Sequence, residues 1–138
     1  MNEEKTNKNE NSFDEQLDKF SKGTLKLFKP IIAAGKEIAE LNYDFRKMTG
    51  WEYANALDSD TNAGSIFKIT NKQALALFAA SAAKETTAQN ESGETYHPLD
   101  AQDIRERIGI DDTIKATQLA SVFFIGSARA GSKRTSNE

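Results

Sequence analysis

The sequence predicts an α+β fold, mainly helical, in which an N-terminal β-hairpin is followed by about four packed helices. Three observations support this prediction. Residues 41–45 alternate apolar and polar side chains, as a half-buried strand does. At Thr49 and Thr70, a Glu or Gln follows the threonine by three residues, which is the capping box of a helix start. Beyond residue 70, apolar residues recur at the spacing of one helix face.

The 138 residues fit one domain with a polar tail at each end. Residues 1–12 contain almost no apolar side chains, and residues 129–138 are similarly polar. Segments of this composition bury too little apolar surface to offset the entropy lost on ordering. We therefore predict disordered tails at residues 1–12 and 129–138, on either side of a single domain formed by residues 13–128.

The predicted hairpin follows a short helix over residues 13–20 and turns near Gly35. The strand before the turn alternates leucine with lysine, and the strand after it contains residues 41–45. Pro30 has no backbone N–H, so its strand is expected to lie at an edge or to carry a break there. Two strands are marginal alone, which implies that helices or a partner support them.

The first predicted helix begins at Thr49, carries Trp51 in its first turn and ends near Asp58. The second begins after Thr70 and is rich in alanine, which favours helix formation and close packing. Its predicted apolar face consists of Leu75, Phe78, Ala79 and Ala82. Residues 86–94 are predicted to be a polar loop.

Two further helices complete the predicted fold. Asp100 can cap a helix that runs through Ile108 and ends at Gly109. Asp111 or Asp112 starts the last helix, because acidic side chains complement the helix dipole there. One face of this helix is marked by Ala116, Leu119, Ala120 and Phe123.

Composition excludes several classes of function. The net charge of −3 and the pI near 5.3 argue against a nucleic-acid binder, which normally has a basic surplus. The absence of cysteine excludes disulfides, cysteine-ligated metals and thiol catalysis. No apolar run is long enough to span a membrane, and the polar N-terminus does not resemble a secretory signal. We therefore expect a cytosolic protein.

No residue pattern indicates an enzyme, a cofactor site or a metal site. Residues 58–62 imitate the start of an EF-hand loop, but Ala63 replaces the turn glycine and Ile69 replaces the bidentate glutamate. His97, the single histidine, has no nucleophile motif that would make it a catalytic base. The paired carboxylates lie at predicted helix starts, where capping accounts for them.

Surplus apolar side chains are the remaining functional signal. Phe123, Phe124 and Ile125 point in three directions around one helix, so they are either wholly buried or partly available to a partner. Trp51 raises the same two alternatives, as a core residue or as a partner's anchor. Our hypothesis is a partner-binding groove lined by Leu75, Phe78, Phe123 and Phe124.

Several short segments resemble the tail assembly chaperones of bacteriophages. The run EIAELNYDFRKMTGWEY, around residues 38–51, resembles their strand and Thr-Gly helix start. The alanine-rich residues 71–84, the opening of residues 99–103 and the closing apolar helix at residues 113–125 are also similar. The likeness covers residues 25–127. The polar N-terminal extension and the long loop at residues 58–69 depart from the shorter family members.

The resemblance implies a function without catalysis. Such chaperones bind the tape-measure protein in the host bacterial cytoplasm, keep its long apolar helices soluble and help to recruit tail tube protein. They are absent from the finished virion. From the composition we expect no cofactor, nucleic-acid partner or membrane partner, while self-association is compatible with the apolar last helix. The alternative is a structural phage tail or head-completion protein that stays in the virion.

Overall fold

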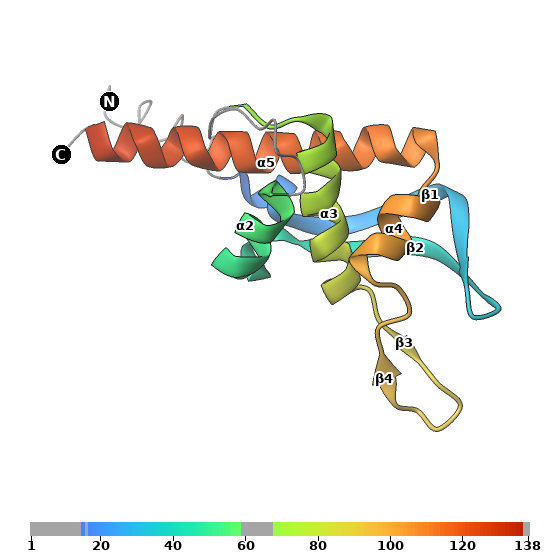
Figure 1. The fold of residues 1–138 in the computed structure, drawn as a ribbon. Helices are drawn as coiled ribbons and strands as arrows, with labels where there is room; N and C mark the ends of the chain where they lie inside the picture. The colour runs from blue at the N-terminus through green and yellow to red at the C-terminus, as the bar shows by residue number, and fades with distance from the viewer. Residues whose placement is uncertain (1–14, 16, 59–67, 137–138) are drawn as a thin grey trace.

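The computed structural model describes residues 15, 17–58 and 68–136, and the surroundings of their side chains up to residue 128. A β-hairpin precedes the helices, so the predicted α+β fold is confirmed (Figure 1). In chain order the elements are β1 (Lys22–Ala33), β2 (Lys36–Asp44), the 3₁₀ turn η1 (Phe45–Lys47), α2 (Gly50–Leu57), α3 (Asn71–Glu85), β3 (Ala88–Gln89), β4 (Thr95–Tyr96), α4 (Ala101–Arg107) and α5 (Ile110–Ser136).

The antiparallel strands β1 and β2 are joined at Ala34 and Gly35, as predicted. Both turn residues have positive φ, 51° and 79°, which is the conformation of a type I′ hairpin turn. The ladder is interrupted on β1 between Lys26 and Ile31, where β1 contains more residues than β2. Pro30 lies inside this bulge, so the expected break in its strand is confirmed.

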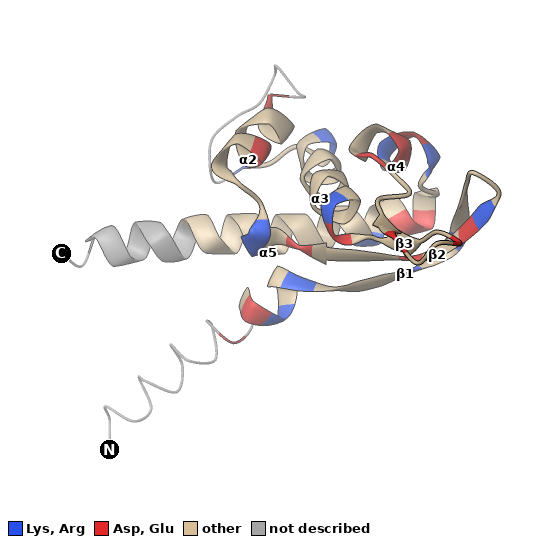
Figure 2. Ribbon diagram, turned by 90° about the horizontal axis from the view of Figure 1, so that it is seen from below, with Lys and Arg blue, Asp and Glu red and all other residues tan. Residues whose placement is uncertain are grey.

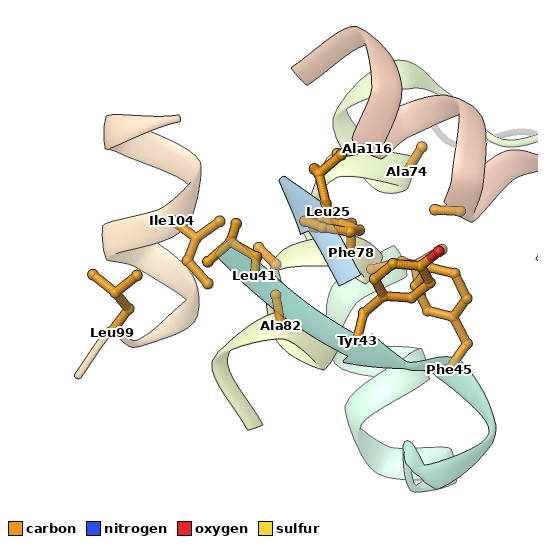
Figure 3. Close-up of a cluster of buried hydrophobic side chains, with 14 of the residues drawn as sticks. Leu25, Leu41, Tyr43, Phe45, Ala74, Phe78, Ala82, Leu99, Ile104 and Ala116 are labelled. Atoms are coloured by element: carbon orange, nitrogen blue, oxygen red, sulfur yellow. The ribbon is translucent and has the colours of Figure 1, made fainter. Parts of the chain in front are cut away.

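Helix α3 lies at the centre of the fold and contacts β2, α2, α4 and α5. Figure 3 shows Phe78 of this helix close to Leu25 of β1 and the rings of Tyr43 and Phe45. The predicted face is confirmed at Phe78, Ala79 and Ala82, which are fully buried. Leu77 is also fully buried on another side, because a helix with neighbours all round needs apolar residues all round.

The predicted helix starts are confirmed by their hydrogen bonds. Thr49 Oγ1 accepts from Glu52 N at 3.1 Å, and Thr70 Oγ1 accepts from Gln73 N at 3.1 Å. The third start has the same geometry, since Asp100 Oδ1 accepts from Asp103 N at 2.7 Å. Local side chains therefore satisfy donors that each helix start would otherwise leave free.

Helix α5 is longer than the sequence predicts, because it continues through residues 129–136 into the predicted C-terminal tail (Figure 1). No proline interrupts this stretch, and extending an existing helix costs far less than starting one. Near Gly126, α5 lies against Leu17 of a short helical segment at residues 17–21. This segment agrees with the helix predicted over residues 13–20, whose residues 13, 14 and 16 lie outside the described part, as does the predicted tail at residues 1–12.

The predicted polar loop at residues 86–94 includes the first strand and the turn of a second, small hairpin, whose other strand follows it. Strands β3 and β4 pair at Ala88 with Tyr96 and at Gln89 with Thr95. Lys36 Nζ donates to Gln89 O at 2.9 Å and lies 5.5 Å from the centre of the Tyr96 ring. These two contacts join the small hairpin to the turn of the main hairpin, a tertiary link that the polar sequence did not indicate.

Candidate protein-binding surface

The structure separates the five residues that the sequence proposed for partner binding. Phe78 is 0% exposed and Phe123 is 5% exposed, so both belong to the hydrophobic core. Leu75 and Phe124 are half-buried, whereas Trp51 is 80% exposed. An open groove lined by Leu75, Phe78, Phe123 and Phe124 is therefore not present, because the fold fills that space with its own side chains.

An aromatic cluster explains why Phe123 and Phe124 are not available. Their ring centres lie 5.1 Å apart, and those of Phe45 and Phe123 lie 5.4 Å apart. The ring of Phe124 also packs on Tyr53 of α2, with ring centres 5.4 Å apart. The cluster thus joins α2, η1 and α5, and the apolar end of α5 stabilises the domain itself.

Other large apolar side chains remain on the surface. On α5, Ile110 is 73% exposed, and Ile114 and Val122 are also exposed. Together with the exposed Gln118 they recur every four residues, so successive side chains lie one turn apart on the same side of the helix. We call Ile110, Ile114, Gln118 and Val122 the α5 row. The helical spacing of the α5 row is visible in the sequence. The apolar residues that face the core have the same kind of spacing, so the sequence alone does not distinguish the exposed series from the buried one.

Phe28 and Ile32 are exposed on β1, close to the start of α5. The backbone N–H groups of Phe28 and Lys29 donate to the two carboxylate oxygens of Asp112, at 2.8 and 3.0 Å. Asp112 is fully buried, so its charge is stabilised by these two donors and by its place in the first turn of α5. The sequence indicated Asp112 only as a helix-start residue and missed this clamp on the bulge.

Trp51 stands on a helix start that is fixed by charge-assisted contacts. Lys84 of α3 donates to Lys47 O at 2.8 Å and to Glu52 Oε1 at 3.1 Å. Partial desolvation raises the pKa of Glu52, but hydrogen bonds from Thr49 and Lys84 outweigh it and hold the pKa below its ordinary value. The exposed indole is therefore presented by a rigid turn.

Within the described residues, no cluster of three or more His, Cys, Asp or Glu side chains could hold a metal ion. His97 is an exposed loop residue. Of the EF-hand imitation at residues 58–62, only Asp58 lies in the described part of the chain. Figure 2 shows acidic and basic segments interspersed over the ribbon, without one strongly charged face.

No helix in the described part of the chain is long and apolar enough to cross a membrane. The large apolar side chains that are exposed in the described part lie in the α5 row, at Trp51 and at Phe28 and Ile32 of β1. In comparisons with protein families, curated proteins and solved structures, the chain matches none of them.

Proposed function

We propose that this chain is a phage tail assembly chaperone, a non-enzymatic protein that binds the tape-measure protein, keeps it soluble and aids recruitment of tail tube subunits. The resemblance over residues 25–127 suggests the family, and the α5 row is the structural observation that supports it. A protein that protects long apolar helices in the host cytoplasm needs exposed apolar side chains on a well-packed scaffold. The α5 row provides them.

The proposed contact differs from the groove suggested by the sequence. Because Phe78 and Phe123 are buried, we propose that a client helix binds along the α5 row instead. Side chains of two helices meet at four-residue spacing, which matches Ile110 and Ile114 and continues to Val122. Trp51 is a second candidate anchor, since an exposed tryptophan on a rigid turn loses little entropy on binding.

Affinity capture from phage-producing cells, with mass spectrometry of the eluate and of purified particles, tests this function. Recovery of the tape-measure protein, with the captured chain missing from particles, is the result expected of an assembly chaperone. A chain found in the particles would instead make it a structural tail or head-completion protein.

Two matched variants test the role of the α5 row. Ile110→Ser combined with Ile114→Ser removes two of its three apolar side chains, and Gln118→Ser changes an exposed residue of the same row that is already polar. We expect recovery of the tape-measure protein to fall only for the first variant, with both variants folded by circular dichroism. Unchanged recovery with the folded double variant would exclude this row as the client surface.

A further inference from the structure

The outer edge of β2 is closed by side chains of the helical layer. Asn42 N donates to Thr86 Oγ1 at 3.0 Å, and Asp44 N donates to Ser81 Oγ at 2.9 Å. Both hydroxyl-bearing residues are buried. The N–H groups of Asn42 and Asp44 therefore point away from β1 and are already satisfied, so a further strand has no place on this side.

The register then fixes the direction of the backbone groups of β1. Thr24 lies opposite Asn42, and Lys22 lies opposite Asp44. In an antiparallel pair, two directly opposed residues either bond to each other through their backbone N–H and C=O groups, or both turn these groups away from the partner strand. The N–H and C=O groups of Lys22 and Thr24 therefore point away from β2, and alternation gives Lys26 the same direction.

Among the residues that the structure describes, no strand lies beside this edge of β1. Within the described residues β1 pairs with β2 alone, and Figure 2 places β1 at the margin of the ribbon, away from α2, α3 and α4. The edge ends at the bulge, because Asp112 occupies the N–H groups of Phe28 and Lys29. The open part therefore comprises residues 22–26.

The side chains along this edge indicate what can pair with it. Lys22, Thr24, Lys26 and Phe28 are exposed at alternate positions, on the face turned away from the core. A second copy pairing antiparallel about Thr24 would bring Lys22 opposite Lys26, and like charges directly opposed destabilise a strand pair. Two acidic residues four positions apart in a partner strand would face the same lysines favourably.

We propose that residues 22–26 of β1 bind an extended, acidic segment of a partner protein by strand addition. The backbone of β1 supplies the hydrogen bonds, Lys22 and Lys26 select Asp or Glu at two positions four residues apart, and Phe28 contacts an apolar residue at one end of the segment. This surface is separate from the α5 row and does not depend on the tail-assembly function.

The test uses the full chain and a capped synthetic peptide, Val-Thr-Glu-Val-Thr-Val-Glu, with a control peptide in which lysine replaces both glutamates. We expect the acidic peptide to bind, to protect the Thr24 and Lys26 amides from hydrogen exchange, and to bind more weakly at high salt. Lys22→Glu with Lys26→Glu should weaken binding about tenfold or more, as two opposed charge pairs become repulsive. Lys72→Glu, a single charge reversal at an exposed position on α3, should leave binding unchanged.

Thr24→Pro provides a second variant, because it removes an outward N–H and no backbone bond to β2. The only bond to β2 that it loses is the one that Thr24 Oγ1 donates to Asn42 Oδ1 at 2.7 Å. It should abolish peptide binding while the circular dichroism spectrum is retained. Lack of binding by the acidic peptide at millimolar concentration, or equal binding by the lysine peptide, would overturn the proposal. So would a dimer in sedimentation that Thr24→Pro converts to monomer, since the edge would then be occupied by a second copy.

Discussion

Gly23 shows how tightly one residue can be constrained by the side chain opposite it. A Cβ at this position would lie 2.9 Å from Tyr43 Oη and 3.2 Å from Tyr43 Cζ. The ring of Tyr43 cannot move aside easily, because it packs on Phe45 and Phe78 at centre distances of 5.0 and 5.5 Å. Glycine is therefore required by space at this point of β1.

A double-mutant cycle tests this constraint. Gly23→Ala should lower the free energy of unfolding by about 1–3 kcal/mol, the usual cost of an overpacked site. Tyr43→Phe removes the nearest atom, so the double variant should lose less than the sum of the two single variants. Urea unfolding of the four proteins measures this difference, and strict additivity would show that the hydroxyl is not the obstacle.

Tyr43 also couples stability to alkaline pH. Burial raises the pKa of its phenol above the ordinary value of 10.0, because the charged form is poorly solvated. Because the folded state favours the neutral phenol, Tyr43 contributes to the free energy of unfolding. This stabilisation is complete below pH 10.0 and is lost as the pH rises through the folded-state pKa. Thermal unfolding should show a smaller alkaline loss for Tyr43→Phe than for the unaltered chain. Equal losses would contradict this role.

At the scale of elements, α5 and α2 carry apolar residues with opposite environments. Phe123→Ala on α5 should cost about 3–5 kcal/mol, because it removes a buried ring from the aromatic cluster. Trp51→Ala on α2 should stay within about 0.5 kcal/mol, since the indole is exposed. Chemical denaturation of both variants checks the contrast. A large loss for Trp51→Ala would mean that its indole is part of the core.

The starts of the helices could be predicted because the two residues that cap each start lie within four positions of the sequence. Thr49, Thr70 and Asp100 each bond to a residue three positions ahead, and the sequence displays both partners. The exposed side of α5 could not be predicted in the same way. Ile110 and Phe123 are both large and apolar, and only the position of α3 and β1 beside the helix decides which is covered.

The whole molecule is held together by contacts that no local pattern indicates. The hydroxyls of Ser81 and Thr86 close β2, and Asp112 closes the bulge of β1. The polar sequence of residues 86–94 resembled a simple loop, because β3 and β4 pair at only two positions and the contact from Lys36 comes from a distant part of the sequence. The candidate groove failed for the same reason, since burial of Phe78 is a property of the assembled domain.

This arrangement predicts a graded pattern of amide hydrogen exchange. The amides of Asn42 and Asp44 donate to buried hydroxyls and should exchange only when the whole domain unfolds. The Asn90 amide closes the small hairpin on Glu94 O and should exchange through local opening, several orders of magnitude faster. NMR-detected exchange at two denaturant concentrations distinguishes these cases. Similar rates at all three amides would show that the small hairpin unfolds with the domain.

The contact between Asp112 and Phe28 also has a consequence for synthesis on the ribosome. The two residues are separated by 84 positions, so the hairpin leaves the ribosome long before its clamp exists. At about 5–20 residues per second, this interval lasts roughly 4–17 seconds. During that time the N–H groups of the bulge are without their carboxylate, and the nascent hairpin is completed only when the last helix is made.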